Sequence, residues 1–294
     1  MISSRLDAQE FNPAFWNRTA LDYFQSNIGL LKTRWDKAEP FHYIVIDNFL
    51  PPTYAERILV EYPEPELKGW DSTTFVHQKR KFTKSHGFPP VIESLFSFLS
   101  DKRFKDQLTL ITGIKDIVSD PDLVGGGLHQ ILQGGFLDVH VDFNYHPKTN
   151  YHRRLNLLLY MNRDWKREYE GYLELWDMTK TVQIADIAPL FNRAVVFETN
   201  EISYHGHPKP LMVPHGLTRK SLAVYYYTKT RESSCLEHNT LYRQTTGISG
   251  YLKTMRSSAE STIERGLSFG LKRLSITLIR KAMRIVRGLQ HENN

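Results

Sequence analysis

Residues 136–147 read FLDVHVDFNYHP, in which histidines and aspartates alternate with apolar and aromatic side chains. Alternation of this kind is typical of a half-buried β-strand, and side chains two residues apart on a strand point to the same side. His140 and Asp142 therefore direct an imidazole nitrogen and a carboxylate oxygen toward one point. This pair is the first indication of where the chemistry of the chain lies.

Short runs rich in branched and aromatic residues surround this stretch, from about residue 127 to residue 229. Turn-forming sequences such as GG, HPKTN and PHG separate them. Short strands without long helices between them favour a β-sandwich or jelly roll over alternating strands and helices. The runs are LHQILQ, FLDVHVDF, RLNLLLYM, YLELWD, VQIADI, AVVFET and SLAVYYYT.

The residues before this region carry mixed, largely helical patterns. FNPAFWNRTALDYFQSNIG predicts a helix with Asn12 as its N-cap and Pro13 at its first position. HYIVIDNFL (42–50) predicts a strand, and PPTYAERILVEYP, PPVIESLFSFLSD and KRFKDQLTLITGI predict three helices. HQKRKFTKSHG (77–87) is interpreted as a solvated loop, the alternative being a lid that supplies basic groups to an anionic substrate.

The pattern of the last region predicts a basic amphipathic helix. Apolar residues from Leu267 to Leu289 recur at steps of three and four, with Lys and Arg on the other side. Residues 251–294 hold nine Lys or Arg against three Glu, so the formal net charge of +6 belongs to this segment. Three interpretations stay open: intramolecular or homo-oligomer contact through 259–290, peripheral contact with an anionic membrane surface, or binding of an acidic macromolecule.

The rest of the composition limits the class of protein. The body before residue 251 has balanced charge, so no nucleic-acid partner is expected. The single cysteine, Cys235, excludes an intramolecular disulfide, and no run of signal-peptide or membrane-spanning length is visible. These features favour a cytoplasmic protein, with attachment at the membrane surface left open by the basic helix.

A metal site that includes the H-x-D pair needs a second histidine, because two histidines and one carboxylate form the facial triad that binds non-haem Fe(II). His205 and His207, in EISYHGHP, face the same way, and spacing alone does not separate them. We favour His205, because Gly206 lets the backbone approach the site. The downstream candidates are His146, His152, His205, His207, His215 and His238.

A second pair of polar residues lies in TRKSLAVYYYT (218–228), where Arg219 and Ser221 are two apart at the start of a strand. A buried arginine beside a hydroxyl is a receptor for a carboxylate. A dicarboxylate that chelates iron at one end can meet these two residues at its other end. This is the physical requirement for binding 2-oxoglutarate.

Taken together, the motifs resemble the 2-oxoglutarate- and Fe(II)-dependent dioxygenase superfamily, in particular its prolyl-4-hydroxylase-like branch. The resemblance rests on H-x-D, S-x-H-G and R-x-S in that order between about 127 and 229. It implies an α+β fold with a mainly β core. This core is a double-stranded β-helix (jelly-roll or cupin-like) with flanking N-terminal helices and a C-terminal amphipathic helix.

The resemblance also implies roles for individual residues. His140, Asp142 and His205 are implied to ligate the metal, which decides between His205 and His207. Arg219 and Ser221 are implied to bind the co-substrate carboxylate. Asn156, on the strand of RLNLLLYM, is implied to contact the metal-bound end of the co-substrate.

The implied enzyme is an Fe(II)/2-oxoglutarate-dependent dioxygenase that uses O2 and releases succinate and CO2. We expect it to hydroxylate an unactivated C–H bond of a small molecule or glycoconjugate. Related halogenases have a small residue in place of the carboxylate ligand, so Asp142 favours hydroxylation over halogenation, while desaturation and cyclisation stay open. The alternatives are a protein (prolyl-type) hydroxylase and a non-catalytic β-helix binding module.

Three regions are expected along the chain. Residues 1–125 form an N-terminal helical and mixed part that packs on the core. Residues 126–232 form the double-stranded β-helix, and residues 233–294 form the basic C-terminal extension.

Overall fold

The computed structural model describes residues 13–65, 69–231 and 238–243. The chain divides into two units, Met1–Thr74 with Gln78–Arg243, and Phe75–His77 with Gln244–Asn294. The site described below belongs to the first unit. Cys235 and the predicted C-terminal helix lie outside the described residues, so the interpretations of that helix stay predictions.

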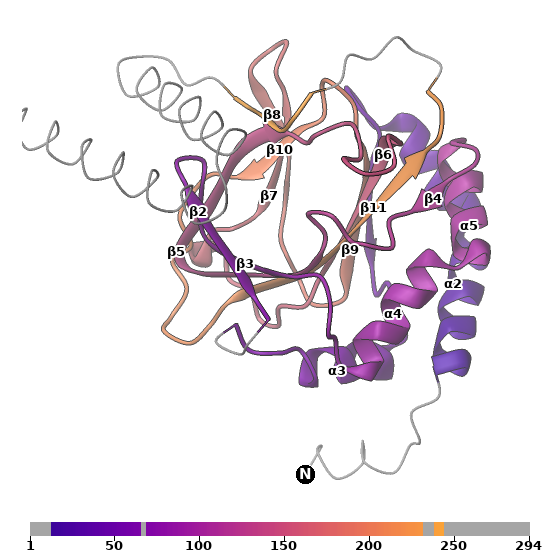
Figure 1. Cartoon of the computed structure of the whole chain (residues 1–294), viewed down its shortest axis with the longest axis horizontal. Coiled ribbons are helices and arrows are strands. Elements are labelled where there is room, and N and C mark those ends of the chain that lie inside the picture. Colours follow the sequence, from indigo (N-terminus) through magenta and orange to yellow (C-terminus); the bar gives the residue numbers. More distant parts are fainter. Residues whose placement is uncertain (1–12, 66–68, 232–237, 244–294) are drawn as a thin grey trace, which may run out of the picture. The chain divides into compact units, whose positions relative to one another are not determined.

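The α-helices lie in the first part of the described chain with three strands between them, and the remaining strands follow (Figure 1). The strand expected within 42–50 and the three helices expected after it are all present, and the first helix continues past the predicted segment to Lys37. The elements are α2 (Pro13–Lys37), β1 (Tyr43–Asp47), α3 (Pro52–Val60), β2 (Asp71–Phe75), β3 (Gln78–Lys84), α4 (Pro90–Ser100), α5 (Lys102–Thr112), β4 (Val118–Ser119), β5 (Gly127–Val141), β6 (His152–Tyr160), the 3-10 turn η1 (Arg167–Tyr169), β7 (Leu173–Asp177), β8 (Val182–Ile187), β9 (Arg193–Glu198), β10 (Tyr204–His207), β11 (Arg219–Thr228) and β12 (Leu241–Tyr242).

The strands form a curled antiparallel sheet in the order β1-β9-β6-β11-β5-β10-β7-β8. The first half of β5 pairs with β11, and its second half pairs with β10. Because β5 takes part in both halves of the sheet, it brings their inner faces toward each other. This is the predicted double-stranded β-helix, and the prediction of the fold is confirmed.

The continuity of β5 differs from the sequence-based prediction, which took GG (134–135) as a turn between two strands. Gly134 adopts a positive φ of 74°, and the strand passes through both glycines. A Cβ on Gly135 would lie 2.5 Å from the Ile131 side chain and 2.9 Å from the Lys79 carbonyl oxygen. The glycines therefore make a bend inside one long strand, where a neighbouring backbone comes too close for a side chain.

The segment 77–87, interpreted from its charges as a solvated loop, is also different. Its residues Gln78–Lys84 form β3, which pairs with β2 on one side and with β5 on the other. Three of the seven residues of β3 are partly buried and two are buried. The loop interpretation was wrong, because backbone pairing to a distant strand holds this charged segment on the sheet.

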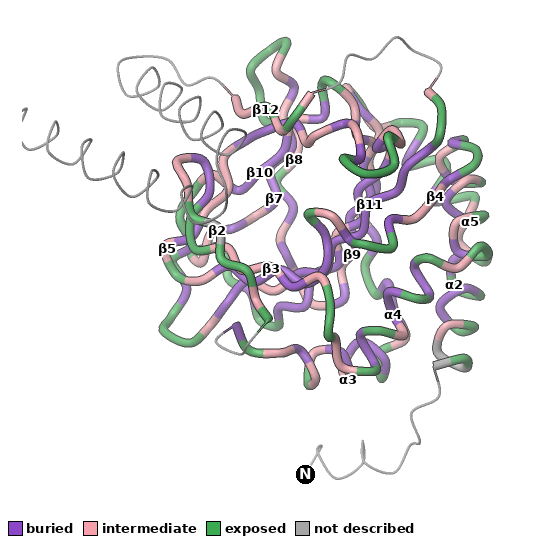
Figure 2. The backbone as a smooth tube through the Cα atoms, viewed as in Figure 1, coloured by how far each residue is buried: buried purple, intermediate pink, exposed green. Residues whose placement is uncertain are grey.

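Helices α2 to α5 lie beside β6, β9 and β11 and cover the outer face of that half of the sheet (Figure 1). Alternate side chains of these strands pack on them, among which Leu157, Val196 and Val224 are at most 1% exposed. The other alternate side chains face the interior, where buried residues also concentrate (Figure 2). The helical layer thus fixes the sheet from outside and leaves its inner face for polar groups.

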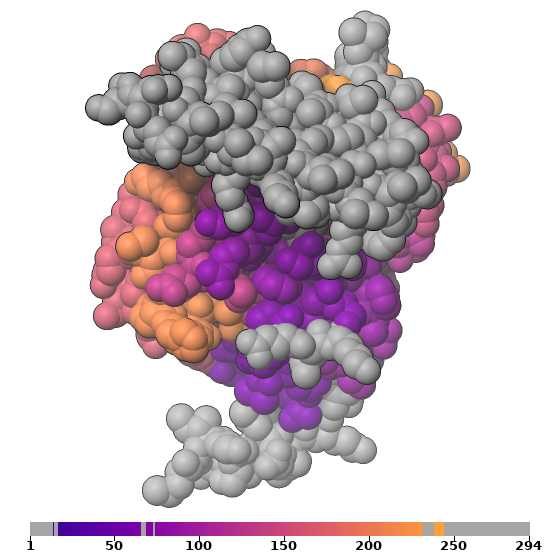
Figure 3. All heavy atoms as spheres, turned by 60° about the vertical axis from the view of Figure 1, so that its left-hand side comes forward, coloured from indigo at the N-terminus to yellow at the C-terminus, as the bar shows by residue number. Residues whose placement is uncertain are grey.

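Segments far apart in the sequence meet on the surface as well. In the space-filling view, residues of the N-terminal third lie beside residues coloured orange, from the last third of the described chain (Figure 3). None of the helices in the described ranges combines the length and apolar character that crossing a membrane requires.

Candidate active site

The predicted pair lies at the end of β5, where strand alternation directs both side chains inward. His140 is 4% exposed, and its Nδ1 lies 2.8 Å from the carbonyl oxygen of Asp138. Donation from Nδ1–H to this carbonyl fixes the ring, so that Nε2 is the free ligand atom. Nε2 lies 3.5 Å from Oδ1 of Asp142.

His205, on β10, is the residue paired directly opposite His140. Its Nδ1 lies 2.9 Å from the carbonyl oxygen of Ser203, and its Nε2 lies 3.3 Å from Oδ2 of Asp142. The two imidazole rings are 4.4 Å apart. Both histidines therefore present Nε2 to the same carboxylate, with a backbone carbonyl orienting each ring.

The close approach of β10 to β5 requires Gly206. A Cβ at this position would lie 2.9 Å from the carbonyl oxygens of both Leu137 and Asp138. The glycine that favoured His205 in the sequence is thus a point of contact between two backbones.

One ligand atom from each of His140, Asp142 and His205 can be chosen so that all three lie within 4.8 Å of one another. Two neutral imidazole nitrogens and one carboxylate oxygen are the donor set that binds non-haem Fe(II) and leaves positions open for other ligands. The donor set and the orientation of each ring fit such an ion.

A buried arginine neutralises Asp142. Arg153 is fully buried, and its Nη2 lies 2.9 Å from Oδ2 of Asp142; Asn156 donates to the same oxygen from Nδ2 at 2.7 Å. Burial by itself raises the pKa of Asp142, but the charge of Arg153, together with hydrogen bonds from His140 and His205, outweighs it and holds the pKa well below its usual value. The carboxylate is therefore ionised and ready to bind a cation.

Sequence reasoning missed Arg153, and the reason is a break in alternation. A register shift between β6 and β11 occurs where Leu155 pairs with Tyr226 and Arg153 with Tyr227. Simple alternation would put Arg153 on the helix-covered face with Leu155, whereas its guanidinium lies 3.4 Å from the ring centroid of Tyr225. A charged residue at the start of an apolar strand was the available signal.

Arg219 and Ser221 lie farther along the same inner face, at the start of β11, and both are nearly fully buried. Arg219 donates from Nε to the Gly171 carbonyl at 2.7 Å and from Nη2 to the Tyr160 hydroxyl at 3.3 Å. Ser221 is paired directly with Tyr160 on β6. The predicted carboxylate receptor is therefore assembled, with its arginine fixed in place by a carbonyl and a phenol.

Gly171 allows this arrangement. Its φ is +73°, and a Cβ there would lie 2.3 Å from the Leu211 side chain and 3.1 Å from Cδ of Arg219. The segment before β7 consequently closes tightly over Arg219, which excludes water from that side of the guanidinium.

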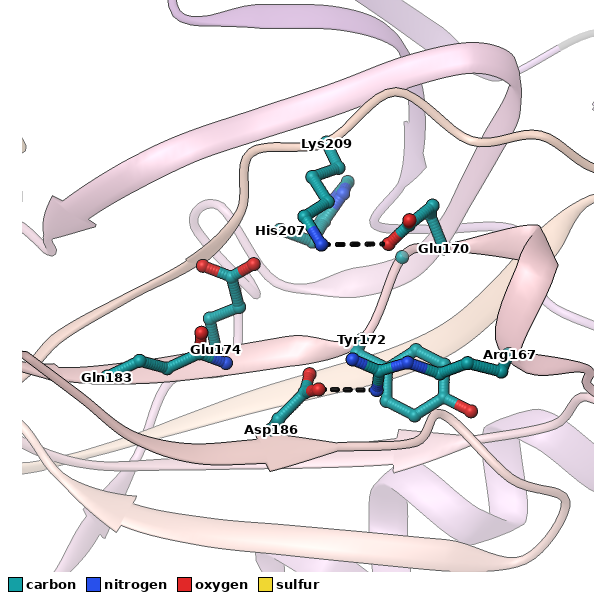
Figure 4. A pocket seen from close by; sticks show the side chains of 9 residues that line it. Arg167, Glu170, Tyr172, Glu174, Gln183, Asp186, His207 and Lys209 are labelled. Atoms are coloured by element: carbon teal, nitrogen blue, oxygen red, sulfur yellow. Dashed lines mark ion pairs between the residues drawn. The ribbon is translucent and has the colours of Figure 1, made fainter.

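A small pocket opens beside this end of the interior, between η1, β7, β8 and the end of β10 (Figure 4). Two ion pairs cross it, Lys209 with Glu170 at 3.5 Å and Arg167 with Asp186. His207 also lines the pocket; it is 4% exposed, and neither ring nitrogen has a hydrogen-bond partner in the structure. Burial, then Arg219 and Lys81, lower the pKa of His207 well below its usual value.

Two glutamines on β5 near the site do not face the interior as functional groups. Gln130 donates to the Pro63 carbonyl at 2.6 Å and accepts from Thr218 at 2.6 Å, so its amide is used in structural hydrogen bonds. Gln133 is exposed.

The comparisons with known proteins agree with this geometry. The family model described as "2OG-Fe(II) oxygenase superfamily" matches residues 126–227. No curated protein matches the chain.

Two solved structures share the fold at low identity. A prolyl hydroxylase from Trichoplax adhaerens, in complex with a hypoxia inducible factor peptide fragment, has 16% identity and a TM-score of 0.51 over 70% of this chain and 92% of that chain. A prolyl 4-hydroxylase from Phytophthora capsici has 16% identity and a TM-score of 0.50 over 97% of this chain and 92% of that chain. The predicted resemblance is confirmed: residues 126–227 match the model of the 2OG-Fe(II) oxygenase superfamily, and the chain shares the fold of these two prolyl hydroxylases. Together with the His-Asp-His donor set, this match indicates an oxygenase that uses Fe(II), 2-oxoglutarate and O2.

Proposed function

We propose that His140, Asp142 and His205 hold the Fe(II) of this oxygenase. The observation that carries the proposal is the convergence of both Nε2 atoms on the Asp142 carboxylate, at 3.5 and 3.3 Å. Each ring is already oriented by a backbone carbonyl, so little reorganisation is needed when the metal binds.

Arg219 and Ser221 bind the distal carboxylate of 2-oxoglutarate in this proposal. Support comes from the burial of both side chains on the face that carries the three metal ligands, and from the two hydrogen bonds that fix the guanidinium. Asn156 lies at the metal-bound end of the co-substrate, because its amide donates to Asp142. Its role there is to orient the carboxylate and to contact the co-substrate.

The reaction proposed is hydroxylation of an unactivated C–H bond. Bound Fe(II), 2-oxoglutarate and O2 supply the oxidising chemistry, with succinate and CO2 as by-products. The residues of the chain orient the dicarboxylate between Asp142 and Arg219 and exclude water around Arg219 through Gly171 and Tyr160. Arg153 keeps Asp142 ionised.

The first candidate substrate is a proline-containing peptide. It is supported by the Trichoplax adhaerens structure, a prolyl hydroxylase that holds a peptide fragment. The second candidate is the small molecule or glycoconjugate expected from the sequence. The pocket of Figure 4 supports it, because charged and polar side chains such as Glu174 and Lys209 line it and suit a polar ligand.

An anaerobic titration tests the proposed ligand set. Fe(II) followed by 2-oxoglutarate is added to the metal-free protein, and the visible metal-to-ligand charge-transfer band is recorded. We expect the band in the wild type, its absence in Asp142→Ala and a weaker affinity for 2-oxoglutarate in Arg219→Ala. Asp106→Ala, an exposed position on α5, is the control and should behave as the wild type. An unchanged band in Asp142→Ala would contradict the assignment of Asp142 as a ligand of the metal.

The substrate proposal needs a separate assay. Succinate formation is measured with proline-containing peptides and with sugar-linked small molecules, and the product is analysed for the gain of one oxygen atom. Oxygen insertion into a sugar-linked compound but into no peptide would reverse the order of the two candidates.

A further inference from the structure

Lys81 lies on the inner face of the sheet, outside the region that the family model matches. It belongs to β3 and is paired with Ile131 of β5, which is paired on its other side with Arg219 of β11. Directly paired residues point to the same face, so Lys81, Ile131 and Arg219 form one row across three strands. Neighbouring strands are about 4.8 Å apart, which puts the backbones of Lys81 and Arg219 about 10 Å apart.

The charges around Lys81 are mostly positive. Its ammonium interacts electrostatically with Asp142, Arg219 and Arg153, and among the described residues Asp142 is the one carboxylate of this group. That carboxylate already pairs with Arg153 at 2.9 Å. Before the metal is counted, these four groups leave an excess of two positive charges, which is equal in magnitude and opposite in sign to the charge of the 2-oxoglutarate dianion.

A second observation indicates that the space between these groups is built for a polar ligand. His207 lies on β10 two residues after His205 and lines the same pocket as Gly171, the residue whose carbonyl accepts from Arg219. It interacts electrostatically with Arg219, Lys81 and His140. Both of its ring nitrogens lack hydrogen-bond partners although the residue is 4% exposed. Buried polar atoms are rarely left without a partner, and a bound dicarboxylate would supply an acceptor for the one N–H of the neutral ring.

We propose that Lys81 is a second cationic residue for the distal carboxylate of 2-oxoglutarate, which it holds together with Arg219. This inference rests on the proposed function, because it needs the dicarboxylate to extend from the metal ligands to Arg219. It assigns a binding residue to the β2–β3 hairpin, which precedes the matched region 126–227. The hairpin thereby takes part in co-substrate binding as well as in covering the sheet.

The lowered pKa of Lys81 is consistent with this placement. Burial, opposed by Asp142 and aided by Arg219 and Arg153, lowers the pKa of Lys81 to about 8. An ammonium held among other cations is stabilised when a carboxylate arrives beside it.

The experiment measures 2-oxoglutarate affinity in the full-length Fe(II)-loaded protein without O2, by the charge-transfer band and by calorimetry. Lys81→Met keeps most of the stem and removes the charge. We expect it to weaken the affinity about 10- to 100-fold, the range for a hydrogen bond between charged groups. Lys81→Arg should restore most of the affinity. Lys79→Met, an exposed position on the same strand, is the matched control and should leave it unchanged.

A ligand change separates the distal carboxylate from other contacts. 2-Oxobutyrate has the metal-chelating end of the co-substrate but no distal carboxylate, so Lys81→Met should not change its affinity. Equal losses for both ligands would place Lys81 at the metal end and overturn the proposal. Affinity for 2-oxoglutarate within about twofold of the wild type would overturn it as well, since a hydrogen bond between charged groups is worth more than that.

The same binding measurements distinguish a failure of the role of Lys81 from a failure of the proposed function. A wild-type protein that binds neither Fe(II) nor 2-oxoglutarate contradicts the proposed function. A wild type that binds both, with unchanged affinity in Lys81→Met, contradicts the role of Lys81 alone. Far-UV circular dichroism checks that each variant is folded, and Lys81→Gln replaces Lys81→Met if the latter is not.

Discussion

The two ends of the barrel interior differ in how far the chain satisfies its own polar groups. At the metal end, Asp142 accepts from Arg153 and Asn156, and carbonyls orient both histidine rings. At the other end, cationic side chains gather, and His207 has no hydrogen-bond partner in the described structure. The first end is organised before any ligand binds, whereas the second has a deficit of negative charge that a dicarboxylate can fill.

The largest expected effect comes from breaking the buried ion pair at the metal end. Arg153→Met leaves the Asp142 carboxylate buried without its cation, which should lower the free energy of unfolding by about 3–5 kcal/mol. Urea denaturation of the metal-free protein measures this. Arg154→Met, at the adjacent and less buried position, is the control and should cost clearly less. Equal losses in both variants would contradict a special role for the pair.

A steric change should affect only the arginine end. Gly171→Ala places a methyl group 2.3 Å from Leu211 and 3.1 Å from Arg219 at a positive φ, so we expect a loss of about 1–3 kcal/mol in unfolding free energy. Affinity for 2-oxoglutarate should also fall, while affinity for Fe(II) stays the same. Gly216→Ala is a matched control, because its φ is also positive but no atom lies within 4 Å of the added Cβ. Loss of Fe(II) binding in Gly171→Ala would show that the two ends are not independent.

Co-substrate binding at the arginine end should depend on pH through Lys81. The pKa of Lys81 is about 8, so below this pH the ammonium is already formed, and above it a proton must be taken up when the anion binds. Affinity for 2-oxoglutarate should therefore be constant below about pH 8 and fall above it, by at most about tenfold per pH unit.

The other groups that face Lys81 do not titrate in this window. The histidines have lowered pKa values, Asp142 has a pKa well below its usual value, and the arginines stay charged. The groups are Asp142 and His129 on or directly after β5, Arg153 on β6, His207 on β10 and Arg219 on β11. Lys81→Arg should therefore remove the fall in affinity above pH 8; persistence of the fall would assign it to another group.

The smallest effect concerns the histidine without partners. His207→Leu replaces a buried polar ring that makes no hydrogen bond, so unfolding free energy should be unchanged or rise by about 1 kcal/mol. His129→Leu is the comparison. Nε2 of His129 lies 3.1 Å from the carbonyl oxygen of Gly125, so this variant loses a hydrogen bond and its unfolding free energy should fall. Thermal unfolding of the metal-free variants measures both, and a clear loss in His207→Leu would mean that the ring is satisfied in solution.

Local patterns predicted most of the elements but not two of the groups that surround the ligands. The alternation around His140 and the spacing of Arg219 and Ser221 are properties of single strands, so they could be predicted without tertiary structure. Arg153 faces inward because a register shift between two paired strands reverses alternation. Lys81 faces inward because 78–84 pairs with β5, which the charges of that segment gave no reason to expect.

The residue types and the local geometry of this site follow from the order of amino acids, since the two-residue repeat of a strand is enough to put His140 with Asp142 and Arg219 with Ser221. Which distant groups meet these pairs depends on how the strands pair in three dimensions. The bend of β5 at Gly134 and Gly135, the contact of Gly206 with a neighbouring backbone and the pairing of β3 depend on hydrogen bonds and steric fit between strands far apart in the chain. Such pairings bring Lys81, Arg153 and His205 to one interior, and no local pattern contains them.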